Sequence, residues 1–519
     1  MSTLVQISIL PRQQEDTSFI LELALQKAKL RGIDIKDWRI RKRSIDARRE
    51  PIKINLQVEF WLNDEQRIQV PPFIPKDVSN KREIAIIGAG PAGLYAALRA
   101  VEAGFKPIIF ERGKDVRERR RDLAAINKEQ TVNPESNYCF GEGGAGTYSD
   151  GKLYTRSKKR GNVLKAIEWF VHFGADPDIL VDAHPHIGTN KLPKIITAMR
   201  EAIIAAGGQV HFNAKMTDVI VKDNAISGIQ INDSQTYFFS ELILATGHSA
   251  RDIFYLLHKK NITIEAKPFA LGVRVEHQQQ LIDTIQYHGD GENPYLPPAS
   301  YALVEQVDGL GVYSFCMCPG GIIAPCATNQ QEVVTNGWSP SKRNNPYANS
   351  GIVVSVSPQD LPNYTPENPF VCLEFQQEVE KTCWEAAGKT QRVPAQRMVD
   401  FVEGNISKDF PKTSYQPGIV SVDLNVVLPK LITKRLQKAF VAFGKKMKGY
   451  YTNQAVLHAP ESRTSSPVLI PRSKDTLEHI DIKGLYPCGE GAGYAGGIIS
   501  AAIDGINCVD AIVKKLKLS

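Results

Sequence analysis

Several features that would narrow the possible roles of this 519-residue chain are scarce or missing. Eight cysteines are too few for a disulfide framework, and they are typical of reduced thiols in the cytoplasm. No apolar run approaches the roughly 20 residues that a membrane-spanning helix needs. The N-terminal segment also lacks the charged start and the long apolar stretch of a signal peptide. We therefore expect a cytoplasmic protein without a membrane span.

The chain also has little excess charge. Lys and Arg number 63 against 56 Asp and Glu, which leaves a formal net charge of +7. A charge this small suits anionic ligands without requiring nucleic acid. Hydrophobic residues make up 42% and charged residues 23%, a globular composition that excludes a largely disordered chain. The length predicts about three domains.

The strongest signal begins at an apolar, strand-like run over Ile84–Ile87. A glycine-rich turn and a helical pattern follow, and a second strand-like run ends at Glu111. The turn reads Gly88-Ala89-Gly90-Pro91-Ala92-Gly93. Because strand, turn, helix and distal acid occur in the required order, they favour a dinucleotide site over a purely structural glycine turn.

Each part of this motif has a physical role. Gly88 permits the tight turn, Gly90 lets the backbone approach a pyrophosphate, and Gly93 lets the helix pack closely on the strand. The helix N-terminus offers free N–H groups and a partial positive charge to the phosphates. Glu111 would accept hydrogen bonds from the adenosine ribose and would repel a 2′-phosphate, and the adjacent Arg112 belongs to the same predicted site.

Two later segments distinguish FAD from NAD. Residues 242–247 form an apolar strand that ends in Thr246 and Gly247, which predicts a return of the chain to the same sheet. Near the C-terminus, Gly489 and Glu490 precede a helix predicted over 497–513. A ligand as long as FAD needs such a second glycine turn and a second helix N-terminus. A strand and helix that merely complete the sheet are the alternative, which the clustered glycines disfavour.

The second turn suggests specific contacts. Glu490 would bind ribitol hydroxyls, and the N–H groups near Gly497 and Ile498 would face the flavin pyrimidine oxygen and stabilise negative charge there. The glycine-dense run over 141–146 includes Gly143 and Gly144. We favour a loop against the cofactor there, with a mobile surface loop as the alternative.

These motifs carry a resemblance. The first glycine turn with Glu111, the LILATG strand and the GLYPCGEGAGYAGG terminus are similar to the FAD-binding domain of glutathione-reductase-type flavoproteins. Further runs, RSIDARRE, GEGGAGTYSDGKLYTR, SFCMCPGG, TNGWSPSKR and ESRTSSPV, resemble a bacterial family of FAD-dependent dehydrogenases or NAD(P)/FAD-dependent oxidoreductases. The resemblance covers nearly the whole chain. It implies FAD as the cofactor and names no substrate.

Missing motifs narrow the chemistry. The chain has one full dinucleotide fingerprint, so it lacks a dedicated NAD(P)H domain. A CxxxxC redox disulfide after the first helix is also absent, and Cys139 stands alone. Disulfide-reductase activity of the glutathione- or thioredoxin-reductase kind is therefore disfavoured. The electron donor or acceptor stays open, with NAD(P)H bound without its own domain as one candidate.

Three further residues are candidates for catalysis. Cys316 and Cys318 would share one face of a strand, where they are either redox or nucleophilic groups or buried small hydrophobes, and a metal site is disfavoured. Arg463 would hold a carboxylate or the charge of the reduced flavin, with a surface pair to Glu461 as the alternative. His458 is more often structural than a proton-transfer group.

We therefore expect an α/β fold: a discontinuous Rossmann-type FAD-binding domain, an inserted, mostly β substrate domain and a small N-terminal α+β domain. The predicted boundaries are listed in chain order: N-terminal domain 1–70, linker 71–80, first part of the FAD-binding domain 81–264, substrate domain 265–420, and last part of the FAD-binding domain 421–519.

The leading hypothesis is an FAD-dependent oxidoreductase of the dehydrogenase type, which passes a hydride between a small-molecule organic substrate and non-covalent FAD. Two other hypotheses stay open. Basic stretches over 39–49 and 430–448 raise a flavin-bearing RNA-binding or RNA-modifying protein that uses the N-terminal domain, although the near-absence of interleaved aromatics disfavours nucleic acid. A redox sensor built on Cys316 and Cys318 is the third.

Overall fold

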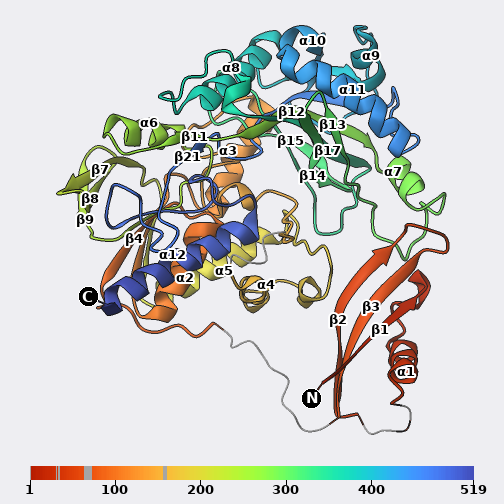
Figure 1. Cartoon of the computed structure of the whole chain (residues 1–519), viewed down its shortest axis with the longest axis horizontal. Coiled ribbons are helices and arrows are strands. Elements are labelled where there is room, and N and C mark those ends of the chain that lie inside the picture. The colour runs from red at the N-terminus through yellow and green to blue at the C-terminus, as the bar shows by residue number, and fades with distance from the viewer. Residues whose placement is uncertain (1, 31, 33–34, 63–72, 156–160, 519) are drawn as a thin grey trace.

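Two large β-sheets with their helices form the main body of the molecule, and a small third unit stands at its edge (Figure 1). The structure is a computed structural model that describes residues 2–518, except for 31, 33–34, 63–72 and 156–160. Among the described residues, no helix combines the length and the apolar character needed to cross a membrane. The chain is of the mixed α/β class, as the sequence predicted.

The first sheet has five parallel strands that come from three distant segments of the chain. In spatial order they are β22 (Leu485–Pro487), β10 (Leu242–Leu244), β4 (Glu83–Ile87), β5 (Lys106–Phe110) and β6 (Gln209–His211). β10 lies between β4 and β22, and this pairing confirms the predicted return of the chain to the first strand.

Two helices that follow glycine turns pack on this sheet, α2 (Pro91–Ala103) and α12 (Ile498–Leu518). They pass so close that a Cβ on Gly505 would lie 2.1 Å from the carbonyl oxygen of Ala92. Further helices in this part of the chain are α3 (Val116–Glu129), α4 (Val163–His172), α5 (Leu192–Ala205) and the 3₁₀ turns Gly144–Gly146 and Pro177–Leu180.

The other face of the five-stranded sheet is covered by a small antiparallel sheet and a helix, which share one apolar core with it. These elements are β7 (Met216–Lys222), β8 (Ala225–Ile231), β9 (Gln235–Phe238) and α6 (Arg251–Lys259). A two-stranded antiparallel ribbon then pairs β11 (Glu265–Ala266) with β21 (Val468–Leu469). The chain leaves for the second large sheet just after β11 and returns just before β21.

The second sheet has seven strands, antiparallel except for one parallel pair at its edge. In spatial order they are β13 (Val304–Val307), β14 (Leu310–Cys318), β17 (Tyr347–Val356), β12 (Phe269–Gln278), β20 (Val456–Glu461), β18 (Val393–Arg397) and β19 (Ile419–Ser421). The hairpin β15 (Ile322–Pro325) and β16 (Thr335–Trp338) lies beside it.

Helices cover one face of the seven-stranded sheet and bury a core of their own (Figure 1). They are α7 (Gln279–Gln286), the 3₁₀ turn Pro358–Asp360, α8 (Val371–Ala386), α9 (Met398–Glu403), α10 (Leu424–Val427) and α11 (Lys430–Lys446). The apolar side chains of α11, including Ile432, Leu436 and Phe440, lie in this core. The region predicted to be mostly β therefore also carries a helical layer.

One predicted boundary differs from the structure. The sequence assigned residues 421–519 to the last part of the FAD-binding domain, but α10, α11 and β20 belong to the seven-stranded sheet and its core. The chain then passes through β21 of the two-stranded ribbon and rejoins the first sheet at β22. The error has a physical reason: the amphipathic pattern of α11 shows that one face is buried without showing which sheet buries it.

The N-terminal unit is a three-stranded antiparallel sheet with one helix on it. Its elements are β1 (Thr3–Ile9), the 3₁₀ turn Pro11–Gln13, α1 (Thr17–Ala28), β2 (Asp37–Asp46) and β3 (Lys53–Trp61), in the strand order β1-β3-β2. Asp16 caps α1 by accepting the N–H of Phe19 at 2.9 Å. Of the predicted linker, residues 71 and 72 lie outside the described residues, and residues 73–80 contain neither helix nor strand.

The N-terminal unit contacts the rest of the chain through β2. Arg43 forms ion pairs with Asp182 at 2.7 Å and Asp178 at 2.9 Å, and its backbone N–H donates to the carbonyl oxygen of Val181. The contacted segment continues to Pro185, whose carbonyl oxygen accepts the N–H of Leu153 at 2.9 Å. The unit thus rests on a segment that borders the cavity described next.

Candidate functional site

A cavity of about 350 Å³ lies where the five-stranded and seven-stranded sheets meet. Residues from both glycine turns and from the seven-stranded sheet line it. Of the residues predicted for the site, the following line the cavity: Gly88, Gly90, Pro91, Ala92, Glu111, Arg112, Gly144, Thr246, Gly247, Cys316, Arg463, Gly489, Glu490, Gly497 and Ile498. Gly93, Gly143 and Cys318 are not among the lining residues.

The first glycine turn forms one wall, and its glycines serve different purposes. Gly88 has a φ of +101°, and a Cβ there would lie 2.4 Å from the carbonyl oxygen of Ala245. A Cβ on Gly93 would lie 1.9 Å from the carbonyl oxygen of Gly88, so this glycine serves the packing of helix on strand. Around Gly90, by contrast, a Cβ would meet only the Cα of Gly144, at 3.9 Å. Gly90 therefore borders open space.

The loop over 141–146 lies directly on this turn. Gly143 donates its N–H to the carbonyl oxygen of Ala89 at 2.8 Å, and Gly144 faces Gly90. Gly143 has a φ of +77°, and a Cβ there would lie 2.0 Å from Oγ1 of Thr147, so its role is to shape the loop. Gly144 lines the cavity.

The carboxylate of Glu111 binds backbone N–H groups of the first glycine turn and of the segments next to it. Its carboxylate accepts the backbone N–H groups of Ala89 at 2.8 Å, Gly113 at 2.9 Å and Gly141 at 2.9 Å. It thereby joins the first glycine turn to the loop that lies on it. The carboxylate also lines the cavity, where an oxygen can accept one more hydrogen bond.

Arg112 is tied to other side chains. Its guanidinium pairs with Glu135 at 2.6 Å and Asp252 at 2.9 Å, and it lies over the ring of Phe140 at 4.2 Å from the centroid. Burial lowers the pKa of Arg112, but the two carboxylates more than offset burial and raise it overall. A ligand would therefore meet a fixed, charged Arg112.

The second glycine turn meets the chain that follows β10, at the carboxyl ends of the parallel strands. A Cβ on Gly491 would lie 2.5 Å from the carbonyl oxygen of Gly247, so these two segments touch through backbone. Between them, Oγ1 of Thr246 is buried without a hydrogen-bond partner. An orphaned hydroxyl on a cavity wall, next to two helix N-termini and the space at Gly90, fits an elongated ligand with phosphates and hydroxyls, as FAD is.

Glu490 and Gly497 contact each other. Burial raises the pKa of Glu490, and a hydrogen bond from the backbone N–H of Gly497 opposes the shift. The predicted N–H donor at Gly497 is therefore engaged by Glu490. His248 lies beside this pair, with Nε2 3.7 Å from Glu490. Burial, together with the positive charges of Arg463, Arg251 and Lys267, lowers the pKa of His248 to about 4, so the ring is neutral at pH 7.

The opposite wall comes from the end of β14. Cys316 has a φ of +45°, and the pairing of β14 with β17 is irregular between Phe315 and Cys318. Cys316 lines the cavity, whereas Cys318 is fully buried. The regular strand that would place both thiols on one face is therefore interrupted here. Nζ of Lys152 lies 4.0 Å from each sulfur and donates a hydrogen bond to the carbonyl oxygen of Met317.

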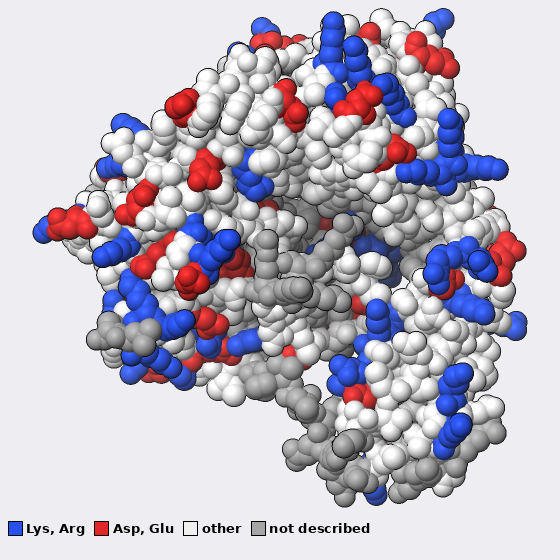
Figure 2. Space-filling model, in the orientation of Figure 1, with Lys and Arg blue, Asp and Glu red and all other residues white. Residues whose placement is uncertain are grey.

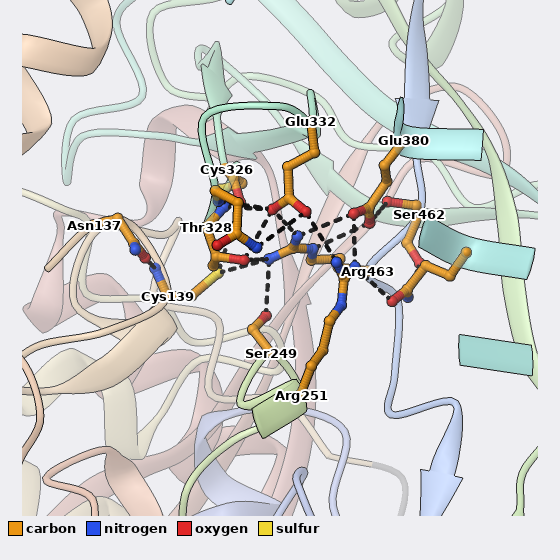
Figure 3. Close-up of polar contacts among 12 residues, drawn as sticks. Asn137, Cys139, Ser249, Arg251, Cys326, Thr328, Glu332, Glu380, Ser462 and Arg463 are labelled. Atoms are coloured by element: carbon orange, nitrogen blue, oxygen red, sulfur yellow. Dashed lines mark hydrogen bonds and ion pairs between the residues drawn. The ribbon is translucent and has the colours of Figure 1, made fainter. Parts of the chain in front are cut away.

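Arg463 belongs to a buried cluster of charges (Figure 3). Its guanidinium pairs with Glu332 at 2.5 Å and Glu380 at 3.0 Å. Arg251, from α6, pairs with the same two carboxylates at 2.9 Å and 2.6 Å. Two arginines and two glutamates thus balance one another at the junction of the two sheets.

This cluster corrects the alternative interpretation of Arg463, a surface pair with Glu461. Its guanidinium donates to Glu380, Glu332, Ser249 and Thr328, so its three nitrogens are already engaged by the protein. The side chain is 5% exposed, and it does not pair with Glu461 at the surface. Glu461 instead binds Arg274 through two hydrogen bonds of 2.7 Å. Arg463 therefore joins elements at the cavity, which it also lines, and its role toward a carboxylate or the reduced flavin stays a prediction.

Sequence reasoning missed three residues of the site. Lys152 and His248 line the cavity; Lys152 lies in the run GEGGAGTYSDGKLYTR and His248 directly follows the LILATG strand, but neither was predicted as a site residue. Arg119, on α3, is fully buried and donates to the carbonyl oxygens of Asn137, Tyr138 and Glu142, which shapes the loop under the first turn. An arginine in the basic run RERRR looks like a solvated helix face, and only its helical spacing relative to Val116 and Leu123 could have indicated burial.

A buried group of possible metal ligands, Cys488, Asp504 and Cys508, lies under the second turn. Asp504 already binds Arg472 at 2.6 Å and accepts the N–H of Gly489 at 2.8 Å. The same guanidinium lies 3.6 Å from the sulfur of Cys508. Because a cation already occupies this position, we assign the group to holding the turn in place.

Two further candidates came from the sequence: His458 for proton transfer and the basic stretches for RNA binding. His458 is fully buried on β20 and does not line the cavity, and burial lowers its pKa to about 4. Figure 2 shows Lys and Arg interspersed with Asp and Glu on the face it displays. In the N-terminal unit, Arg39 and Arg41 pair with Glu59. This distribution does not support the RNA-binding hypothesis.

Comparisons with known proteins agree with a flavoprotein. Residues 268–464 match the family model described as "FAD-dependent protein, C-terminal domain-like", and residues 1–61 match a domain of unknown function (DUF8436). An uncharacterized protein of Clostridium beijerinckii is 37% identical over 97% of each chain. The chain belongs to the same family as this clostridial protein. The narrower resemblance to glutathione-reductase-type flavoproteins stays a prediction.

More distant similarities involve named flavoenzymes. A probable fumarate reductase, Ifc3, of Shewanella frigidimarina is 24% identical over 39% of this chain and 38% of its own. Glycine oxidase from Bacillus cereus is 14% identical, with a TM-score of 0.31 and coverage of 84% of this chain and 96% of its own. A flavocytochrome c3 fumarate reductase is 12% identical, with a TM-score of 0.33 and coverage of 84% and 78%. These TM-scores are too low to assign an activity to the present family.

Proposed function

We propose that this protein is an FAD-dependent oxidoreductase of the dehydrogenase type, with FAD held non-covalently in the cavity. One observation carries the proposal: two glycine turns, each at the N-terminus of a helix, face one cavity at the carboxyl ends of two parallel strands, β4 and β22, of the same sheet. Open α/β sheets bind their ligands at this edge. The match of residues 268–464 to an FAD-dependent family supports the choice of cofactor.

On this proposal each glycine turn would bind a different part of FAD. The N-terminus of α2 and the space at Gly90 would hold the pyrophosphate. Glu111 would accept a hydroxyl of the adenosine ribose while it keeps its three backbone donors. Thr246 and Glu490 would bind ribitol hydroxyls, and Ile498 would present the first N–H groups of α12 to the flavin. Bound FAD would supply two-electron redox chemistry.

The organic substrate would occupy the wall formed by the seven-stranded sheet. Cys316, Phe315 and Lys152 line the cavity there, so a small molecule would meet one thiol, one ring and one ammonium group. The ammonium group favours an anionic substrate or a substrate that develops negative charge. On this proposal the five-stranded sheet is a discontinuous Rossmann-type FAD-binding domain, and the seven-stranded sheet is the inserted substrate domain.

FAD retention by a Gly90→Val variant tests the proposal. Gly90 has a φ of −73°, which valine can adopt, and a side chain there would enter the cavity rather than the protein. We expect wild-type protein to carry FAD and the folded variant to lose it, as measured by absorbance near the flavin bands after gel filtration. Gly311→Val, at a strand position outside the cavity, is the matched control and should retain FAD.

The proposal would be refuted if wild-type protein were colourless and stayed colourless after incubation with FAD. Full FAD retention by a folded Gly90→Val variant would show that the pyrophosphate lies elsewhere. To identify the substrate class, reduced metabolites and NAD(P)H can then be tested anaerobically for their ability to bleach the flavin.

A further inference from the structure

The end of β14 departs from a regular strand at a cysteine. Cys316 lies in the left-handed region, with a φ of +45°, where non-glycine residues are rare. The register with β17 is shifted between Phe315 and Cys318. Strain of this kind persists where the surrounding structure imposes it, and it is concentrated at functional sites. Here its effect is to bring Cys316 to the cavity.

The two thiols of this segment are unequal. Cys316 is partly exposed in the cavity, whereas Cys318 is fully buried. The sulfur of Cys318 lies 3.3 Å from the carbonyl oxygen of Cys316. The thiol of Cys316 can thus contact a ligand in the cavity, and the thiol of Cys318 lies behind it in the protein.

The surrounding charges favour a thiolate at Cys316. A hydrogen bond from Cys318 lowers the pKa of Cys316; burial opposes this effect, and the positive charges of Lys152 and Arg274 reinforce it. The same hydrogen bond and burial raise the pKa of Cys318. Asp150, the negative group nearest to Lys152, also pairs with Arg343 at 2.7 Å. Lys152 therefore keeps an ammonium group 4.0 Å from both sulfurs.

We propose that Cys316 and Cys318 form a thiol–disulfide exchange centre that reduces small disulfides entering the cavity. The Cys316 thiolate attacks one sulfur of R–S–S–R, the substrate S–S bond breaks, and the first RS⁻ leaves and takes a proton from solvent. Cys318 then loses its proton to solvent and attacks the Cys316 sulfur. The second RS⁻ leaves, and a Cys316–Cys318 disulfide remains.

This reaction balances within one turnover. Two protein thiols are oxidised, one disulfide is reduced to two thiols, and no further electron donor is needed. The proposal goes beyond the proposed function, because a single turnover does not require FAD. A metal site at this pair is disfavoured, because the ammonium group of Lys152 already lies 4.0 Å from both sulfurs.

Two other pairs of cysteines are competitors that the structure disfavours. Cys488 lines the cavity but is fully buried, as is Cys508, and Arg472 and Asp504 occupy their surroundings. Cys139 lines the cavity, but its sulfur contacts the carbonyl oxygen of Cys326 at 3.8 Å rather than a second cavity thiol. An ammonium group next to two adjacent thiols is present only at Cys316 and Cys318 among the three pairs.

The test uses the reduced full-length protein and bis(2-hydroxyethyl) disulfide under anaerobic conditions. We expect two equivalents of 2-mercaptoethanol per chain, a loss of two hydrogens in the intact mass, and a peptide map with a Cys316–Cys318 disulfide. Because Cys316 is already a thiolate, release of the first equivalent should change little in rate between about pH 6 and pH 8, whereas an ordinary thiol speeds up about tenfold per pH unit there.

Variants separate the two roles. Cys318→Ser should release one equivalent and trap 2-mercaptoethanol as a mixed disulfide on Cys316. Cys316→Ser should react only at the background rate of the remaining cysteines. Cys139→Ser, which removes a different cavity thiol, should behave as wild type. Thermal melting shows whether each variant is folded, and the peptide map of the wild-type protein decides the matter if a variant is not.

Three results would overturn the proposal: a disulfide mapped to other cysteines, wild-type reaction by folded Cys316→Ser, or two equivalents released by Cys318→Ser. The FAD content is measured on the same samples. A protein that carries FAD but does not exchange disulfides refutes only this inference. A protein that exchanges disulfides but never binds FAD refutes only the proposed function.

Discussion

The two walls of the cavity are built in different ways. The wall on the five-stranded sheet consists largely of backbone: two glycine turns, the loop over 141–146 and the first turns of α2 and α12. The wall on the seven-stranded sheet consists of side chains: Cys316, Lys152 and the cluster around Arg463. A backbone wall recognises what many dinucleotides share, and a side-chain wall is where a family acquires its own chemistry.

The comparison has a physical lesson. A backbone wall depends on local geometry, so a few glycines in a row determine it. A side-chain wall depends on charges that balance across the junction of two sheets, as Arg251 and Arg463 do with Glu332 and Glu380. The following substitutions break one wall at a time, and they are ordered from the largest expected effect to the smallest.

Glu332→Gln should have the largest effect on stability, because it removes one carboxylate from a buried cluster of four charges. Loss of one partner leaves a buried arginine poorly compensated, which costs about 3–5 kcal/mol. The free energy of unfolding from urea titration at pH 7 measures this loss. Gln331→Ala, at the exposed adjacent position, is the control. A loss below about 1 kcal/mol would mean that the cluster is not a stabilising junction.

The same variant has a pH dependence with a definite sign. Burial raises the pKa of Glu332, but Arg463 and Arg251 more than offset burial, so its pKa in the folded protein is lowered. A lowered folded pKa gives stability that is full above the unfolded value of about 4.3 and is lost as the pH falls below it. Wild-type protein should therefore lose stability more steeply than Glu332→Gln as the pH falls below about 4. Parallel acid unfolding curves would contradict this assignment.

Gly93→Ala should disturb the backbone wall through packing. The added Cβ would lie 1.9 Å from the carbonyl oxygen of Gly88, so helix and strand must separate, which costs about 1–3 kcal/mol. Gly90→Ala is the matched control, since its Cβ meets nothing closer than 3.9 Å, and it should cost about 1 kcal/mol or less. Equal melting temperatures for the two variants would refute the distinction between them.

Lys152→Met should change reactivity more than stability. Removal of a positive charge 4.0 Å from the sulfur raises the pKa of Cys316 by about one unit or more. The pH profile of iodoacetamide alkylation, with Cys316 identified by peptide mapping, measures this shift. Lys191→Met, which removes a lysine outside the cavity wall, should leave the profile unchanged. An unchanged profile for Lys152→Met would contradict the claim that the charge of Lys152 lowers the pKa of Cys316.

Arg43→Gln should have the smallest effect. Arg43 is 29% exposed, and its partners Asp182 and Asp178 are 37% and 63% exposed. Solvent screens such pairs, so the expected loss is about 0–1 kcal/mol. Because the backbone hydrogen bonds of Arg43 remain, FAD content and thiol reactivity should match wild type. A loss of several kcal/mol would show that the N-terminal unit supports the cavity more strongly than its ion pairs indicate.

More of the backbone wall than of the side-chain wall could be predicted from the sequence, because the backbone wall depends on local geometry. The glycine turns, the Thr246-Gly247 strand end and the C-terminal helix were accessible because each is a local pattern with a fixed geometric meaning. Lys152, Arg251 and Glu380 were not, because nothing near them in the chain indicates which distant charge they meet. The positive φ at Cys316 was also hidden, since it arises from a register shift between β14 and β17 rather than from its own residue type.

The ribbon of β11 and β21 has a mechanical consequence. The chain passes from the first sheet to the second beside β11 and returns beside β21, so both backbone crossings lie at one place. A rotation of one sheet relative to the other would therefore change backbone dihedrals beside this ribbon. The ion pairs of Arg251 to Glu332 and Glu380 join the two sheets at the cavity, so such a rotation would have to break them.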